Sequence, residues 1–341
     1  MRRYLLYFAV SAFISATCFL ILRSFYIVQQ TYAQTFDILL KKQESYPILM
    51  FGDSAVSASL PGDSEPTGID QFIAQAAAQP VFLLQHDAYS PLVYQHYAAY
   101  LASSQHKPKI SILPINLRTW AAEWGDRPSY QFRLAVQYID FRGRGVGGGT
   151  MLLDWLLRSD EGRLDDAWAT REVVTLSGKR IGPNSELQRR RDLLRFTEVF
   201  RDRPICSSPQ SDRNHCQSVV DALWWHYGSE AMNAELVDKA LLGTITILKD
   251  AGIEIVAYLA PINIQDAARL GGPDLVAAIN DRVSRIKGLL AAQHIELLDL
   301  HAILPSDRFG DWSCLCEHLD ELGRKQVAAQ VAESVRLKLA E

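Results

Sequence analysis

Short apolar runs rich in β-branched residues alternate along most of the chain with longer segments of helical periodicity. Five runs have the length and flanking residues of buried strands, namely 47–51, 81–84, 110–115, 253–260 and 295–300. Five segments show helical spacing, namely 69–78, 91–103, 234–251, 273–292 and 321–339. Strands that alternate with helices form a parallel sheet with both faces covered. The sequence therefore predicts an α/β fold with a mostly parallel sheet of about five strands.

Composition supports a folded body and argues against one class of partner. The chain has 341 residues, of which 48% are hydrophobic, so it can bury a large core. Its formal net charge is −4, which supplies no overall positive field to attract a polyanion. We therefore expect no nucleic-acid partner.

The amino-terminal segment has the pattern of a membrane anchor. Arg2 and Arg3 precede 19 uncharged residues, 4–22, which would span about 28 Å as a helix, close to the roughly 30 Å of a hydrocarbon core. We predict an uncleaved anchor at 1–25 and a polar stalk at 26–46. By the positive-inside rule, the body at 47–341 then lies outside the cytoplasm. The predicted location is the cell inner membrane, single-pass, with a periplasmic body.

Cysteine usage agrees with export. Cys18 lies in the predicted anchor, and the body holds Cys206, Cys216, Cys314 and Cys316, an even number for an oxidising compartment. A Cys206–Cys216 disulfide would close a short polar loop, although four cysteines allow three pairings.

A zinc site is the competing interpretation of these cysteines. His215 and His318 would be the additional ligands, but Cys314 and Cys316 have Cys-x-Cys rather than the usual Cys-x-x-Cys spacing. We therefore favour disulfides and predict no metal and no cofactor.

The span 117–233 interrupts the alternation of strands and helices. It is rich in Trp, Arg and Gly, and we predict a mainly helical insertion over one end of the sheet. Gly143, Gly145 and Gly148 match G-x-G-x-x-G, but no strand-to-helix unit surrounds them, so we interpret them as a loop.

The first predicted strand ends in Gly52-Asp53-Ser54. A serine on a tight turn at the carboxyl end of a strand lies at the crevice where α/β sheets bind ligands, and its own N–H can point to an oxyanion. Val56 replaces the second glycine of the G-x-S-x-G elbow. A second Gly-Asp-Ser, 62–64, follows no strand, and we interpret it as coincidence.

With these residues the chain resembles the SGNH, or GDSL, hydrolase family over 47–103, 110–118 and 253–339. The resemblance implies a three-layer sandwich and a nucleophilic Ser54. It also implies an oxyanion-binding Asn116 after the third strand and a general base, His318, before the last helix. A neutral amide can donate to developing negative charge, and a serine hydroxyl needs a base to take its proton.

Two family positions differ in this chain. The acid that orients the base normally precedes it by three residues, where Leu315 stands; Asp311 is our first choice, with Glu317 or a Ser-His dyad as alternatives. The second block has no glycine, so the backbone N–H of Ala88 or Tyr89 would complete the oxyanion hole.

The remaining histidines receive other interpretations. His301, two residues after Asp299, is the rival base, and His86 lies near the expected crevice and could contact substrate. Histidines 96, 106, 215, 226 and 294 are interpreted as surface or partly buried structural residues.

The resemblance implies a serine-dependent ester hydrolase or O-acyltransferase that acts outside the cytoplasm on acyl groups, such as acetyl groups, of an envelope glycan. The expected partners are the acylated glycan, the bilayer and a membrane acyl-donor protein. The alternatives are a non-catalytic glycan-binding or scaffold protein of the same fold and a lipid-directed esterase.

Overall fold

The structure is a computed structural model. It describes residues 46–60, 62–86, 88–125, 130, 132–144, 173–174, 180–181, 223–310 and 317–340, together with residues 11, 13–15 and 17–18. Most of the predicted anchor and nearly all of the stalk lie outside these ranges, as do the four cysteines of the body. Within the described ranges, no helix is long and apolar enough to cross a bilayer.

The centre of the molecule is a five-stranded sheet in the order β2-β1-β3-β6-β7, and every neighbouring pair is parallel. The strands are β1 (Ile48–Gly52), β2 (Val81–Gln85), β3 (Ile110–Ile115), β6 (Glu254–Leu259) and β7 (Leu297–Asp299). The predicted α/β fold with a parallel five-stranded sheet is confirmed. Strands β4 (Val173–Val174) and β5 (Arg180–Ile181) form a separate two-stranded antiparallel sheet.

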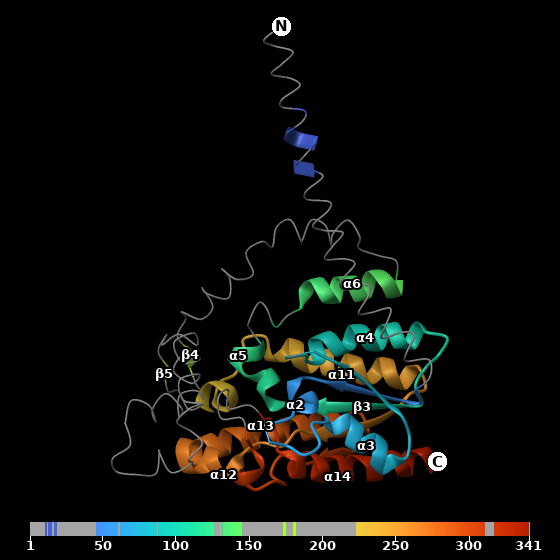
Figure 1. Cartoon of the computed structure of the whole chain (residues 1–341). Helices are drawn as coiled ribbons and strands as arrows, with labels where there is room; N and C mark the ends of the chain where they lie inside the picture. Colours follow the sequence, from blue (N-terminus) through green and yellow to red (C-terminus); the bar gives the residue numbers. More distant parts are fainter. Residues whose placement is uncertain are drawn as a thin grey trace.

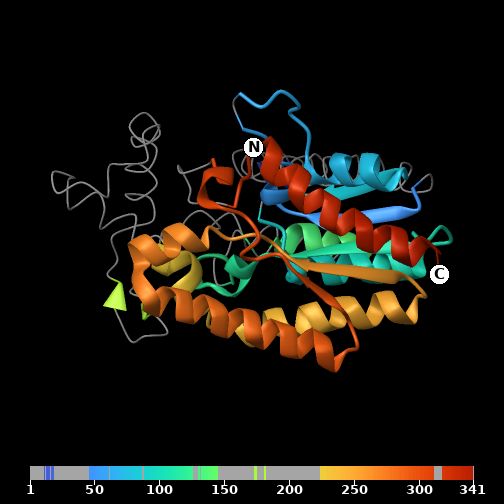
Figure 2. The same cartoon turned by 90° about the horizontal axis from the view of Figure 1, so that it is seen from below.

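Helices cover both faces of the sheet (Figure 1). The larger ones are α3 (Ile69–Ala77), α4 (Pro91–Ser103), α6 (Arg133–Arg144), α11 (Ala234–Asp250), α13 (Gly272–Ala292) and α14 (Glu321–Ala340). The shorter ones are α2 (Ser54–Ser57), η1 (Leu117–Trp120), α5 (Ala122–Gly125), η4 (Trp224–Gly228), α12 (Ile264–Asp266), η5 (Ala267–Gly271) and η6 (Ser306–Arg308). Helices α4 and α11 lie on one side of the sheet, and α3 and α14 lie on the other, the side nearer the viewer in Figure 2.

Alternate strand residues enter two different cores, as the period of two in a strand requires. Leu49 and Phe51 of β1 pack with residues of α4, α11 and α13. Ile48 and Met50 of the same strand pack with residues of α3 and α14. The sheet is therefore buried on both faces, and the strand ends are where its polar residues can meet a ligand.

The two ends of the insertion lie together beside the end of β3. The Ala231 N–H donates to Trp120 O at 2.8 Å, and the Ala122 N–H donates to Ser229 Oγ at 3.1 Å. Buried Arg282 of α13 donates to Leu117 O at 3.4 Å and also to the carbonyl of Ser229. The described parts of the insertion are mostly helical, and its return packs against η1 and α5, which directly follow Asn116.

Candidate active site

Ser54 stands on the turn that ends β1. Asp53 is the N-cap of α2, and its Oδ1 accepts a hydrogen bond from the Ala55 N–H at 2.8 Å. A Cβ on Gly52 would lie 3.0 Å from Leu83 Cδ1 and 3.1 Å from Val56 Cβ, so the turn leaves little room for a larger residue. Asp53 is buried, whereas Ser54 is half-buried at the carboxyl end of the strand. The sequence thus places its candidate nucleophile where ligands bind to α/β sheets.

Asn116 lies at the same edge, directly after the neighbouring strand β3. Its Oδ1 accepts from the Arg118 N–H at 3.1 Å, which caps η1. Its Nδ2 donates to Asp53 Oδ2 at 3.1 Å and lies 3.4 Å from Glu317 Oε2. Asn116 therefore connects the turn of the candidate nucleophile to the segment that precedes α14.

His318 follows Glu317 in that segment and is half-buried. Its carbonyl accepts from the Gly310 N–H at 3.1 Å, and an antiparallel bridge joins Phe309 to Leu319. Its charge acts on the Asp53 carboxyl, so the imidazole lies within electrostatic range of that group. Between the two described residues Ser54 and His318 there is no hydrogen bond; such catalytic contacts often tighten only when substrate binds.

Ala88 has a left-handed backbone conformation, which favours glycine. Its φ is +62°, in the left-handed region, and the residue is buried. It stands in the loop between β2 and α4, where the family resemblance leads us to expect a glycine. Ser90 and Pro91 then begin α4 as the N-cap and the first helical residue.

A buried polar cluster joins these segments, and sequence reasoning missed most of it. Glu317 is only 3% exposed; its Oε1 accepts from the Tyr227 hydroxyl, and its Oε2 lies 3.6 Å from Arg118 Nη1. Arg118 Nη2 lies 3.4 Å from His226 Nε2. We call the set Asp53, Asn116, Arg118, His226, Tyr227 and Glu317 the buried polar cluster.

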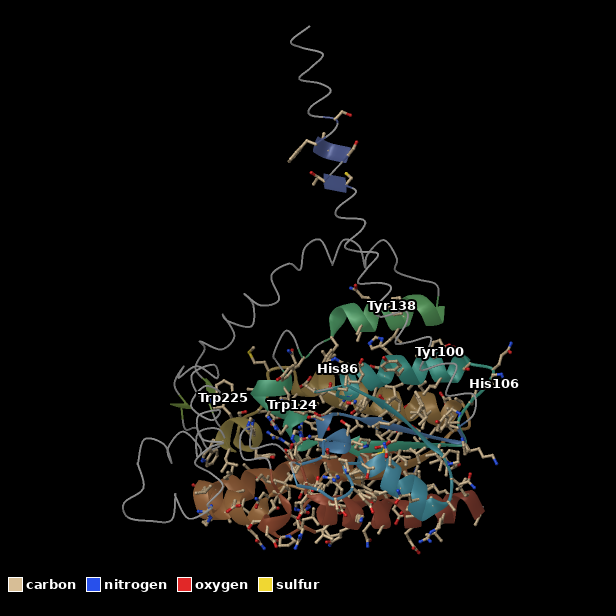
Figure 3. All side chains as sticks on the ribbon, viewed as in Figure 1. His86, Tyr100, His106, Trp124, Tyr138 and Trp225 are labelled. Atoms are coloured by element: carbon tan, nitrogen blue, oxygen red, sulfur yellow. The ribbon has the colours of Figure 1, made fainter. Side chains whose placement is uncertain are left out.

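The cluster corrects the interpretation of His226 as a surface or partly buried residue, because that side chain is 5% exposed. His226 lies in the π-helical turn η4, where the insertion returns, and its partner Arg118 lies in η1, where the insertion begins. The guanidinium of Arg118 also lies 4.8 Å from the ring centroid of Trp124. Trp124 and Trp225, from the two ends of the insertion, lie at the same end of the sheet (Figure 3). Two signals were available: Arg118 lies two residues after Asn116, and four ring-bearing residues occur in a row at 224–227.

Burial and charge shift the ionisation of Asp53. Its pKa rises from 3.8 to about 6, chiefly because the carboxyl is buried and then because Glu317 is negative. Hydrogen bonds from Ala55 and Asn116, and the charge of His318, oppose the rise. Burial likewise raises the pKa of Tyr94 and of Tyr258, and the negative charge of Asp53 adds to both shifts. The edge of the sheet therefore holds two close carboxylates and one amide in a site that largely excludes water.

The rival base, His301, lies elsewhere. Its Nδ1 contacts the carboxylate of Asp299, which also pairs with Lys287. Strand β7 is the third strand along from β1, a distance of about 14 Å at the usual strand spacing. The structure does not bring His301 to the turn of Ser54.

Two further predicted residues are His86, which the structure describes, and Asp311, which lies outside the described residues. His86 is exposed beside Ala88, with its ring 5.3 Å from that of Tyr89 and 5.3 Å from that of Phe132. Asp311 is our first choice as the orienting acid. Among the described side chains, no group of three or more His, Cys, Asp and Glu is placed to hold a metal ion.

The second Gly-Asp-Ser, which we interpreted as a coincidental match to the motif, has a structural role: its Asp63 and Ser64 bind the start of α14. Asp63 Oδ1 accepts from the Glu321 N–H at 3.2 Å, while the Ser64 N–H and Oγ donate to Glu321 Oε2 at 2.8 and 2.6 Å. Fully buried Arg324 pairs with Asp63 Oδ2 at 2.9 Å and donates to Leu319 O at 2.6 Å. We call the set Asp63, Ser64, Glu321 and Arg324 the clamp. Through Arg324 it holds the carbonyl of Leu319, the residue after His318.

Comparison with known proteins gives little further information. No family model and no curated protein matches the sequence. A solved acetyl xylan esterase, Est2A from the rumen bacterium Butyrivibrio proteoclasticus, aligns with a TM-score of 0.35 and 11% identity. The alignment covers 86% of this chain, which spans 64% of the length of that protein. A TM-score this low does not define the fold or the activity of this chain.

Proposed function

We propose that the chain is a serine-dependent ester hydrolase or O-acyltransferase with Ser54 as its nucleophile. One observation carries the proposal: Asn116 contacts both Asp53, the neighbour of Ser54, and Glu317, the neighbour of His318. These contacts support the proposal because the proposed nucleophile and the proposed base each adjoin a residue that Asn116, the proposed amide donor, contacts. These are the groups that acyl transfer through serine requires.

In the proposed reaction, Ser54 Oγ attacks the ester carbonyl while His318 takes the hydroxyl proton. The oxyanion accepts hydrogen bonds from the N–H groups of Ser54 and Ala88 and from the side chain of Asn116. The C–O bond to the leaving alcohol then breaks, His318 returns the proton to that alcohol, and an acyl-serine remains. Water or a sugar hydroxyl releases the acyl group by the same steps in reverse. Asp311 would orient the imidazole.

The proposed substrate is an acyl group, such as acetyl, on an envelope glycan. Residues 1–25 support this because an anchored, exported body would meet such a glycan, and the family resemblance points to the same class. The proposed location is the inner membrane with the body in the periplasm. A membrane acyl-donor protein would supply the acyl group if the enzyme is a transferase.

The decisive experiment labels the full-length chain with a fluorophosphonate probe and follows hydrolysis of a model acetyl ester. Wild type and Ser64→Ala should be labelled and active, whereas Ser54→Ala should be neither, because the probe bonds to the activated hydroxyl. Labelling that survives Ser54→Ala contradicts the assignment. A folded wild type that is neither labelled nor active would favour the non-catalytic glycan-binding alternative.

A further inference from the structure

Both N–H groups of the Asn116 side-chain amide already have a hydrogen-bond acceptor. Its amide nitrogen carries two hydrogens, and it has two carboxylate acceptors, Asp53 Oδ2 at 3.1 Å and Glu317 Oε2 at 3.4 Å. Its carbonyl oxygen accepts from the Arg118 N–H. The opposite orientation would place that oxygen against two carboxylates and the NH₂ group against another N–H, so the network fixes the assignment.

An oxyanion that binds Asn116 must therefore displace one of the two carboxylates. The bond to Asp53 is the shorter, and Asp53 is also held by the Ala55 N–H. The contact with Glu317 is near the outer limit of a hydrogen bond. Breaking the contact between Asn116 and Glu317 should therefore cost less free energy than breaking the hydrogen bond between Asn116 and Asp53.

Glu317 can release Asn116 and still have partners in the protein. The Tyr227 hydroxyl donates to Oε1, and Arg118 Nη1 lies 3.6 Å from Oε2. A buried carboxylate that keeps a hydrogen bond and a cation avoids most of the cost of an unpaired charge. The buried polar cluster therefore has a second arrangement available, with Asn116 freed on one side.

We propose that Glu317 is a positioning residue for the oxyanion donor Asn116. In the resting enzyme its carboxylate accepts a hydrogen bond from the Asn116 N–H that the oxyanion would use. The reacting ester displaces this carboxylate when it binds. The proposal rests on the proposed function of Asn116. A negative carboxylate at this place competes with developing negative charge, so the resting arrangement restrains the reaction. The acyl-transfer step itself is unchanged.

Glu317→Gln tests the proposal because it keeps the shape and removes the charge. A neutral acceptor binds an N–H less strongly than a carboxylate does. The rate at which the fluorophosphonate probe labels Ser54 in the full-length chain should rise about three- to tenfold. The rise should vanish in an Asn116→Ala background, since the effect passes through that amide.

Asp266→Asn is the matched control. Asp266 is a buried carboxylate that accepts from Asn263 Nδ2 at 2.8 Å and from Arg269, and both partners lie outside the buried polar cluster. Its labelling rate should equal that of wild type. Slower labelling of Glu317→Gln, or an equal rise in the Asn116→Ala background, overturns the proposal.

A second readout does not depend on catalysis. The side-chain ¹⁵N–¹H pair of Asn116, identified by its loss in Asn116→Ala, should shift in Glu317→Gln. If wild type fails to label at all, the proposed function fails, and this resonance still tests the contact; an unshifted pair overturns the inference. If Glu317→Gln does not fold, Glu317→Asp keeps the charge near Arg118, withdraws it from Asn116, and should also speed labelling.

Discussion

The side-chain amide of Asn116 donates to the carboxylate of Asp53 across 3.1 Å, although 63 positions separate the two residues. The same carboxylate caps α2 through the Ala55 N–H. Asp53 thus fixes the turn of Ser54 to the end of β3. The aspartate of Gly-Asp-Ser has a structural task that is distinct from the proposed chemistry of the serine.

Stability should depend on the ionisation of Asp53. Its pKa rises from 3.8 to about 6 on folding, so between these values the folded chain binds more protons than the unfolded chain. The free energy of unfolding should therefore fall as pH rises through this window, by up to about 3 kcal/mol, and the loss is complete above pH 6. Urea unfolding of wild type and Asp53→Asn at pH 4, 5, 6 and 7 measures this contribution as the difference between the two chains. A difference that does not change with pH would contradict the assignment.

The clamp on α14 should contribute strongly to stability. Arg324 is fully buried, and its loss in Arg324→Met would remove the cation from the Asp63 carboxylate, whose side chain is 7% exposed. We expect the free energy of unfolding to fall by about 3–5 kcal/mol in a urea titration. Arg336→Met is the control: Arg336 pairs with Glu333 at 2.8 Å on the surface and should change stability by less than about 1 kcal/mol. Equal effects of the two variants would show that the clamp is not a buried pair in solution.

Ala88 should tolerate glycine, unlike other buried alanines. Ala88→Gly relieves the left-handed φ of +62° and loses one buried methyl group and some chain entropy, so these effects nearly cancel. We expect a change of less than about 1 kcal/mol in the free energy of unfolding. Ala98→Gly, at a fully buried position inside α4, should instead cost about 2 kcal/mol. Similar losses at both positions would argue against the left-handed conformation of Ala88.

Asp311 remains our predicted orienting acid. If it fixes the imidazole of His318, Asp311→Asn should slow turnover of a model acetyl ester by on the order of 10⁴ while the fold stays intact. Circular dichroism of the same sample checks the fold. Small effects on turnover would support a Ser-His dyad instead. Glu317→Gln should not produce a loss, because the Glu317 carboxylate faces Asn116, Tyr227 and Arg118.

The predicted topology follows from Arg2, Arg3 and the uncharged residues after them. Protease added to intact spheroplasts should digest the body and leave an amino-terminal fragment in the membrane fraction. A cytoplasmic marker protein that survives the treatment is the control for intact membranes. Protection of the body would contradict export and, with it, the expectation of disulfides.

The sequence by itself determined the order of strands and helices in the described body. The five predicted strands and five predicted helices occur within about two residues of their expected bounds, and α4 matches its expected bounds at both ends. Periodicity and turn residues are local signals, so they report which segment is a strand or a helix without knowledge of its neighbours. They also placed Ser54 and Asn116 at strand ends and His318 just before the last helix.

Only the tertiary structure decided what the side chains between these segments contact. Glu317 meets Asn116 across 201 positions, and Arg118 meets His226 across 108. No local pattern encodes such pairs, because they arise when separate strands and the returning insertion pack at one edge of the sheet. The same holds for the second Gly-Asp-Ser, whose partners lie in α14. The chain's periodicity determined where each segment runs, and the packing of distant segments in a site with little water determined which polar groups must satisfy one another.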